Sequence, residues 1–241
     1  MIYTSGKNGY LGQKLNLGIS ITKNNLSSTD LSDCSTLYHF GGISRGGYNY
    51  LDYVENVTYT AQILKKINPS ARIIFASTAR IYETHFEFPS DGYSISKFMC
   101  EKLIYLHYLE HKNIYNIFRM GNIVSSDITY GSLKDLSDQI ISGHVKYVPG
   151  GMRPYVDLND MLKLFKLDLP IGVFNAVNQA VTIEDVLDIA GKYFNFTREK
   201  INKRPIRINP HNNLTQYGWT PMNTNEVLDR YFGVLAAKTS R

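Results

Sequence analysis

Short runs of β-branched and aromatic residues alternate, in the first half of the chain, with longer stretches whose apolar positions recur every three or four residues. Alternation of these two periods is typical of βαβ units around a parallel sheet, so we predict an α/β fold. The predicted strands cover residues 1–4, 18–22, 36–40, 72–76 and 115–119, and the predicted helices between them cover 56–67 and 93–111.

The pattern changes after residue 122, where the predicted elements are shorter. We predict helices near 133–141, 182–194 and 225–236, and a strand at 146–149. Thr182, followed by Glu184 and Asp185, is typical of a helix start, because a hydroxyl caps the first turn and carboxylates suit the helix dipole. We therefore predict a domain formed mainly by residues 1–145 and a small lobe formed mainly by 146–241, with some segments returning to the first domain.

The amino-acid composition argues against a disordered, a membrane-spanning and a disulfide-rich protein. The chain has 241 residues, of which 43% are hydrophobic and 12% aromatic, which suits a folded domain with a second lobe and argues against disorder. No apolar run approaches the roughly 18 residues that cross a bilayer, and the first residues carry no basic, apolar leader. Two cysteines are too few for a disulfide framework, and His107 and His111 stand outside any metal-binding motif. We expect a cytoplasmic protein that binds neither a membrane nor a metal ion.

The net charge of +5 raises the question of nucleic acid. The basic residues are scattered, and the longest basic cluster, 200–207, is interrupted by proline, asparagine and isoleucine. A modest positive charge serves an anionic small molecule, such as a nucleotide diphosphate, equally well. We therefore expect no nucleic-acid partner.

Three glycines, Gly6, Gly9 and Gly12, come directly after the first predicted strand. Glycine at such a place allows a tight turn and a close approach of backbone to a pyrophosphate. The spacing differs from the usual dinucleotide motif, and a plain glycine-rich turn would explain it as well.

Tyr93 and Lys97 lie one helical turn apart, so that an ammonium neighbours a phenol on one helix face. Such a pair suits acid–base chemistry near neutral pH. The spacing alone is unspecific, since the chain has five Tyr-x-x-x-Lys pairs. Context singles out Tyr93: it opens a helix after a turn-rich stretch, and Ser77 and Thr78 end a buried strand upstream. Strand ends are where α/β sheets carry their chemistry.

Taken together, the motifs resemble an extended short-chain dehydrogenase/reductase of the nucleotide-sugar epimerase/dehydratase family. Nine segments match in order along almost the whole chain. They are GKNGYLG at 6–12, YHFGG at 38–42, NV at 56–57, FASTARIY at 75–82, YSISK at 93–97, RMGN at 119–122, RPYVD at 153–157, FNA at 174–176 and YGWTP at 217–221.

The resemblance implies a fold, a site and a reaction. The fold would be a Rossmann-like parallel sheet with helices on both faces and a small C-terminal substrate lobe, and a homodimer would form through helix 93–111. Thr78, Tyr93 and Lys97 would be catalytic, with hydride passing between the nicotinamide of NAD(P) and one carbon of a nucleotide-diphosphate sugar. The implied cofactor-binding residues are Gly6, Gly9, Tyr10, Leu11, Gly12, Phe40, Gly41, Gly42 and Lys97. The implied substrate-binding residues are Asn122, Arg153 and Arg207; a guanidinium can hold a diphosphate bidentately.

Departures from the family pattern narrow the choice among the reactions that the family catalyses. Ala79 and Arg80 stand where the family's 4,6-dehydratases carry an acidic pair, so we do not expect a dehydratase. A 4-keto reductase is the first expectation, and a 4-epimerase with bound NAD is the alternative. Only five residues separate Gly12 from Gly18, which leaves room for barely one turn of the first helix. That shortening favours a third interpretation, a catalytically silent NAD(P)-binding regulatory protein.

Two residues bear on the choice of cofactor. Lys23 follows the second predicted strand, where an ammonium would accept the 2′-phosphate of NADP. Asp30, eighteen residues after Gly12, would instead bind the ribose of NAD. We favour NADP, with NAD as the alternative.

Overall fold

The computed structural model describes residues 1–43, 50–83, 91–129 and 131–240. It divides into two compact units. Unit 1 comprises Met1–Ile81, Glu87–Arg119 and Phe165–Phe174, and unit 2 comprises Tyr82–Phe86, Met120–Leu164 and Asn175–Arg241. The division falls earlier in the chain than the expected boundary near residue 145, and one later segment returns to the first unit.

Unit 1 is built on a six-stranded sheet in the order β2-β1-β3-β4-β5-β9. β1 pairs in parallel with β2 on one side and with β3 on the other, and β3 pairs in parallel with β4. The strand order therefore reverses between β1 and β3. The strands are β1 (Ile2–Ser5), β2 (Ile19–Ile21), β3 (Thr36–His39), β4 (Arg72–Thr78), β5 (Tyr115–Met120) and β9 (Gly172–Ala176).

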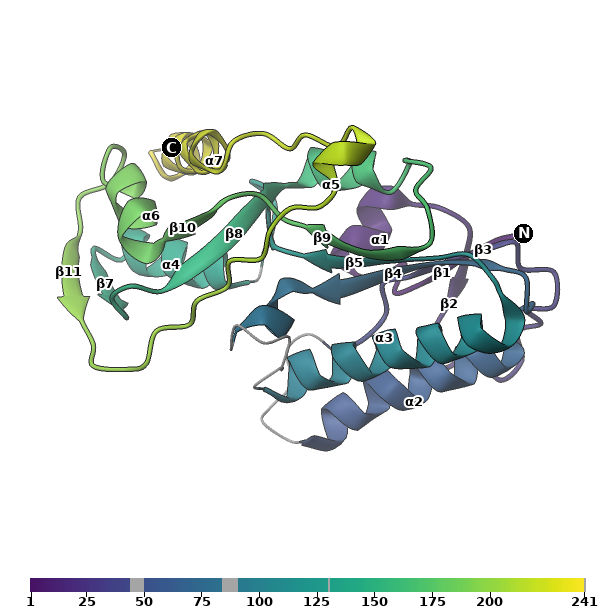
Figure 1. Ribbon diagram of the computed structural model, residues 1–241. Coiled ribbons are helices and arrows are strands. Elements are labelled where there is room, and N and C mark those ends of the chain that lie inside the picture. The colour runs from purple at the N-terminus through teal and green to yellow at the C-terminus, as the bar shows by residue number, and fades with distance from the viewer. Residues whose placement is uncertain (44–49, 84–90, 130, 241) are drawn as a thin grey trace. The chain divides into compact units, whose positions relative to one another are not determined.

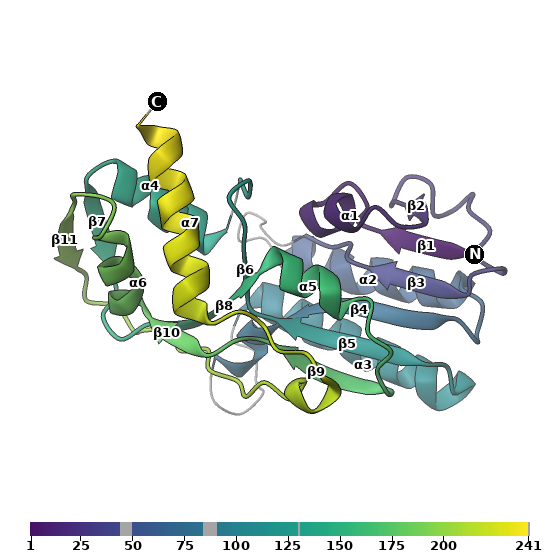
Figure 2. The same cartoon turned by 90° about the horizontal axis from the view of Figure 1, so that it is seen from above.

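Helices cover both faces of this sheet, as predicted (Figures 1 and 2). α2 (Tyr50–Lys66) and α3 (Gly92–His111) pack side by side on one face, and α1 (Tyr10–Leu15) lies on the other. α1 has only six residues, which agrees with the short first helix expected from the sequence. α2 begins six residues before the predicted start at Asn56.

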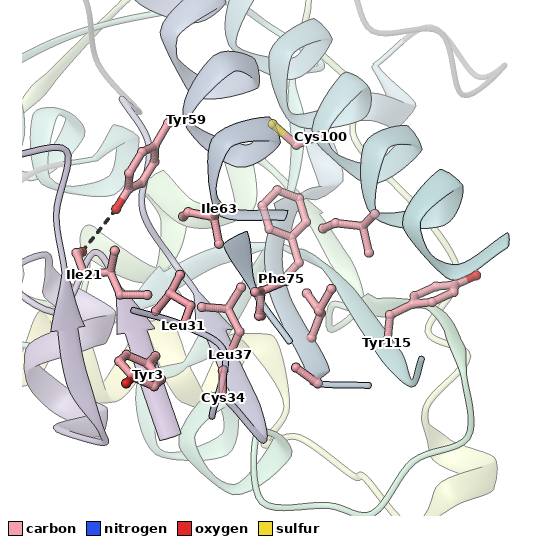
Figure 3. Packing of buried hydrophobic residues seen from close by; sticks show 14 of the residues in the cluster. Tyr3, Ile21, Leu31, Cys34, Leu37, Tyr59, Ile63, Phe75, Cys100 and Tyr115 are labelled. Carbon is pink, nitrogen blue, oxygen red and sulfur yellow. Dashed lines mark hydrogen bonds between the residues drawn. The ribbon is translucent and has the colours of Figure 1, made fainter. Parts of the chain in front are cut away.

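The core of unit 1 lies between the sheet and the pair α2 and α3 (Figure 3). Leu37 and Phe75 project from the strands and Ile63 from α2, and all three side chains are completely buried. Cys34 and Cys100 are free and buried in the same core. The sheet and the two helices thus bury apolar side chains between them, and such burial is the main source of stability for a layered fold.

Unit 2 is a smaller αβ assembly with its own buried core. β8 pairs in parallel with β6 and antiparallel with β10, while β7 and β11 form a separate two-stranded sheet. Thr182 caps α6 in a capping box with Asp185, as the sequence predicted. The elements are β6 (Asn122–Val124), α4 (Ser132–Ile141), β7 (His144–Tyr147), β8 (Met152–Asp157), α5 (Leu158–Leu164), β10 (Ala180–Thr182), α6 (Ile183–Ala190), β11 (Thr197–Lys200) and α7 (Thr224–Thr239).

None of the helices in the described part of the chain is both long enough and apolar enough to span a membrane.

Candidate functional site

The carboxyl ends of β1, β3 and β4 lie at one edge of the unit 1 sheet, because these strands run in parallel. β1 leads into Gly6, β3 into Phe40, Gly41 and Gly42, and β4 ends at Thr78. In open α/β sheets, ligands bind beyond the carboxyl ends of the strands where the strand order reverses. That place is the junction of β1 and β3, which brings the glycine motif and the Gly41–Gly42 pair together.

The glycine turn between β1 and α1 is packed too tightly for side chains. Gly6 has a φ of +75°, and a Cβ there would lie 2.6 Å from the backbone nitrogen of Gly41. A Cβ at Gly12 would lie 2.2 Å from the carbonyl oxygen of Gly6. Gly9 closes the turn by donating its N–H to the Gly6 carbonyl at 2.9 Å, and Tyr10 and Leu11 begin α1. Backbone, rather than side chains, therefore forms the surface of the turn.

A chain of buried hydrogen bonds supports the turn from below. The Ser5 hydroxyl lies 2.5 Å from Nδ1 of His39 and accepts the N–H of Gly41 at 3.2 Å. Nε2 of His39 lies 2.9 Å from the hydroxyl of Thr60, which donates in turn to the carbonyl of Asn56 at 2.8 Å. These partners require His39 to be protonated on Nε2 and to accept at Nδ1. Burial lowers the pKa of His39 to about 3, so the ring stays neutral and keeps this arrangement.

Asn56 joins the segment after β3 to both helices. Its Oδ1 accepts the N–H of Ile43 at 2.6 Å, and its Nδ2 donates to the carbonyl of Ile43 and to the hydroxyl of Ser96. The side chain is buried inside α2, and Ser96 belongs to the first turns of α3. Gly42 and the beginning of α3, which carries Lys97, are therefore held next to each other.

The three residues expected to be catalytic all belong to the carboxyl-terminal end of β4 and the start of α3. Thr78 is the last residue of β4 and is nearly buried. Tyr93 is the second residue of α3, whose start is fixed by a capping box between Asp91 and Ser94. Lys97 lies one turn further along the helix with its ammonium 4.3 Å from the centre of the Phe75 ring.

The ammonium of Lys97 is buried, with only 5% of the residue exposed. Burial lowers the pKa of Lys97 to about 8, while Cys100 and Glu101 act in the opposite direction. Near neutral pH the side chain is therefore a buried cation with an easily lost proton. A buried cation favours the ionised form of a neighbouring phenol, which is the chemistry that a tyrosine acid–base needs.

Glu101 is a buried acid whose role the sequence did not suggest. Its carboxylate pairs with Arg119 of β5 at 2.8 Å and accepts a hydrogen bond from Ser77 of β4 at 2.5 Å. Both charged side chains are at least 95% buried. A buried charge without a partner is strongly unfavourable, so this network fixes α3 against β4 and β5. The only sequence signal is a carboxylate one turn after Lys97, on the side of the helix that faces the sheet.

The two residues that bear on the preference for NAD or NADP, Lys23 and Asp30, lie in different loops of unit 1. Lys23 follows the carboxyl end of β2 and forms an ion pair with Glu55 of α2. Asp30 lies in the segment that leads to the start of β3, where its carboxylate accepts hydrogen bonds from the backbone and the hydroxyl of Ser32. Those bonds lower the pKa of Asp30. The Tyr3 hydroxyl donates to the Asp30 carbonyl, so the structure does not bring Asp30 to the glycine turn.

Unit 2 contains a basic pocket of about 350 Å³ that includes Arg153. Burial raises the pKa of Tyr155 in its wall to about 12, against the opposing effect of Arg153. The sequence did not single out the other cations of the wall, although the cluster 200–207 contains two of them. The charged groups in the wall are Asp135, Lys146, Arg153, Lys203 and Arg204.

The other two residues expected to bind substrate take part in local contacts of unit 2. Asn122 begins β6, where its Oδ1 accepts the hydroxyl of Ser132 at 3.3 Å and its Nδ2 faces the carbonyl of Pro154 at 3.5 Å. Arg207 donates from Nε to the carbonyl of Gly150 at 3.0 Å. Ser132 also lines the basic pocket, so Asn122 lies next to its wall.

Solved structures of other proteins, several of them nucleotide-sugar enzymes, have the same fold. A variant of a UDP-glucuronic acid 4-epimerase from Bacillus cereus, in complex with NAD and UDP-4-deoxy-4-fluoro-glucuronic acid, matches 97% of this chain and 99% of its own at 17% identity and a TM-score of 0.80. TunA, an NAD-dependent NDP-hexosamine 5,6-dehydratase, matches 100% and 98% at 17% identity and 0.79. RMD from Pseudomonas aeruginosa, complexed with NADPH, matches 98% and 99% at 14% identity and 0.77. The predicted Rossmann-like α/β fold is thereby confirmed.

Sequence comparison adds nothing to this likeness: no protein-family profile and no curated protein sequence matches the chain.

Among the residues that the structure describes, no cluster of three or more histidine, cysteine or acidic side chains is arranged to hold a metal ion. His107, one of the two histidines that the sequence places outside any metal-binding motif, is buried, with Nδ1 3.0 Å from Oδ1 of Asn113.

The neutral state of His39 predicts a loss of stability in mild acid. The folded-state pKa lies below that of an unfolded histidine, so its stabilising contribution is complete above about pH 6.5 and falls as the pH drops towards 3. Between pH 7 and pH 5 the free energy of unfolding should fall by about 2 kcal/mol more in the wild type than in His39→Gln. Urea unfolding at both pH values measures this difference. His211→Gln, which removes an exposed histidine, should behave as the wild type does, and equal losses in wild type and His39→Gln would contradict the account.

Proposed function

We propose that the chain is an NAD(P)-dependent oxidoreductase or epimerase that acts on a nucleotide-diphosphate sugar. The observation that carries this proposal is that the glycine turn, Thr78 and the start of α3 all belong to the carboxyl-terminal edge of one parallel sheet. Tyr93 and Lys97 are therefore available to a ligand that binds at the reversal of strand order. The likeness in fold to enzymes with NAD, NADPH and UDP-sugar ligands supports the same reaction class.

The residues of unit 1 suit a dinucleotide. The close contacts of Gly6 and Gly12 exclude side chains from the turn, so that a pyrophosphate can approach its backbone closely. Phe40 and Gly42 continue this surface beyond β3. When bound, NAD(P) supplies or removes hydride at a carbon of the sugar.

The protein's own residues handle the proton. The Tyr93 phenol gives a proton to the sugar oxygen, or takes one from it, as the carbon changes oxidation state. The Lys97 ammonium stabilises the ionised phenol and donates a hydrogen bond to the nicotinamide ribose. Thr78 donates a hydrogen bond to the same sugar oxygen, where negative charge develops. Glu101 and Arg119 keep α3 in the position that these contacts require.

The basic pocket of unit 2 suits the diphosphate of the substrate. It has four cationic side chains and one carboxylate, an excess of positive charge that attracts a doubly charged anion. Arg153 can bind two oxygens at once, which a single lysine cannot. Lys203 and Arg204 take the role that the sequence gave to Arg207, and Asn122 supports the pocket through Ser132.

Two reactions use this chemistry. A 4-epimerase removes and returns hydride with the same bound cofactor, whereas a 4-keto reductase consumes NADPH. The epimerase is favoured by the pairing of Lys23 with Glu55, which cancels the charge that pointed to NADP. The position of Lys23 at the end of β2 favours the reductase. Conversion of a nucleotide-linked hexose without added cofactor would identify the epimerase, and NADPH consumption with a 4-keto sugar nucleotide would identify the reductase.

Replacing Tyr93 should separate catalysis from cofactor binding. Tyr93→Phe removes the proton-transferring hydroxyl, so turnover should fall by roughly a hundredfold or more, while the affinity for NAD(P) should change little. Turnover can be followed by product chromatography with a panel of UDP- and dTDP-linked hexoses. Tyr105→Phe, on the exposed side of the same helix, serves as the control. Full activity of Tyr93→Phe would refute this mechanism, and a wild type that binds NAD(P) without turning over any sugar nucleotide would favour the silent regulatory protein.

Replacing Arg153 should weaken substrate binding without affecting the cofactor. Loss of charge-assisted hydrogen bonds to the diphosphate should reduce the affinity for UDP about tenfold. Titration calorimetry with UDP measures the change, and Lys192→Ala, an exposed cation elsewhere in unit 2, should bind UDP as the wild type does. Unchanged UDP affinity in Arg153→Ala would exclude this pocket as the diphosphate site.

We also propose that two copies of the chain associate through α2 and α3. Both helices expose apolar side chains, which are Leu51, Val54, Ile95, Met99, Leu106 and Leu109. A second copy would bury them; the family resemblance implies a dimer through helix 93–111, and the exposed residues of α2 would extend that interface. Light scattering after size-exclusion chromatography should give twice the monomer mass, and Met99→Glu should give the monomer mass. A monomeric wild type would contradict this arrangement.

A further inference from the structure

Lys23 and Glu55 bring opposite charges together beside the proposed cofactor turn. Lys23 lies two residues beyond β2, and Glu55, thirty-two residues later in the chain, is the sixth residue of α2. Their ammonium and carboxylate form an ion pair, with 45% and 59% of the side chains exposed. Both groups are therefore accessible to a ligand.

Contacts on either side fix where this pair lies. The Tyr59 hydroxyl, one turn along α2 from Glu55, donates to the carbonyl of Ile21 at the end of β2 (Figure 3). The same Tyr59 ring lies 3.1 Å from where a Cβ of Gly41 would be. The neighbouring Asn56 holds Ile43, directly after the Gly41–Gly42 pair. The pair thus lies between the end of β2 and the segment that follows β3.

This is the position at which a dinucleotide fold meets the adenosine ribose. An acid there binds the ribose 2′-hydroxyl of NAD, and a cation accommodates the 2′-phosphate of NADP. The 2′-phosphate carries a charge of roughly −1.5 to −2 at neutral pH, so it is attracted by an ammonium and repelled by a carboxylate. This chain presents one group of each kind, and each of them neutralises the other.

We propose that the Lys23–Glu55 pair sets the cofactor preference of this protein. Glu55 accepts the 2′-hydroxyl of NAD, and Lys23 turns from Glu55 to the 2′-phosphate when NADP binds. Because each cofactor gains one favourable contact and weakens the ion pair in making it, the wild type accepts both with affinities within about tenfold of each other. The inference rests on the proposed NAD(P) site and adds Glu55, which comes from a helix rather than from the end of β2.

The test is the ratio of the dissociation constants for NADH and NADPH, measured by nicotinamide fluorescence. Glu55→Gln leaves Lys23 unneutralised and should shift the ratio towards NADPH by roughly fivefold. Lys23→Glu places two carboxylates at the site and should shift it towards NADH by more than about tenfold. The matched controls are Glu110→Gln at the end of α3 and Lys65→Glu at the end of α2, which make the same changes of charge away from β2.

The outcomes separate this inference from the proposed function. Opposite shifts in the two variants, absent from both controls, would support the pair as the selector. Ratios that match the controls, with both cofactors still bound, would overturn the inference and leave the NAD(P) site standing. A wild type that binds neither cofactor would overturn both. Lys23 and Glu55 are exposed, so both variants should keep the wild-type unfolding temperature, which circular dichroism checks.

Discussion

The contact between the backbones of Gly6 and Gly41 is the constraint on which the rest of the site depends. A Cβ on Gly6 would lie 2.6 Å from the Gly41 nitrogen, so the loops after β1 and β3 approach as closely as two backbones can. Ser5 and His39, the last residues of these strands, are hydrogen-bonded directly below, and Thr60 and Asn56 extend the chain into α2. This chain of contacts therefore connects the loops after β1 and β3 to α2. Backbone forms the surface of the turn, so the proposed dinucleotide site does not depend on the length of α1.

A second set of buried polar groups fixes α3, the helix that carries Tyr93 and Lys97. Lys97 keeps an ammonium in an environment that disfavours charge, and Glu101, one turn further on, opposes that effect. Glu101 is held by Arg119, so the network carries no unpaired charge, and Ser77 connects it to the strand that ends at Thr78. Buried ion pairs contribute little net stability, but they are sensitive to geometry. The network is thus better understood as a means of positioning α3 than as a source of folding energy.

The sequence predicted the first half of the fold well, because its strands and helices carry clear periodicity. The five predicted strands, the two long helices and the short first helix all occur in unit 1. Prediction was poorer in unit 2, where β6, β10 and β11 have three or four residues each and show no readable alternation. The same limit applies to the site. Motifs adjacent in sequence, such as Tyr93 and Lys97, could be found, whereas Glu55 and Lys203 acquire a role only through contacts between distant segments.

The central claim is that the glycine turn of unit 1 binds a nicotinamide dinucleotide. Titration calorimetry of NAD into the wild type and into Gly12→Ala tests it most directly, because one added Cβ would lie 2.2 Å from the Gly6 carbonyl oxygen and displace the turn. The wild type should show one binding site, and Gly12→Ala should bind at least about tenfold more weakly with its secondary structure retained. Absence of binding by the wild type, or equal binding by a folded Gly12→Ala protein, would contradict it.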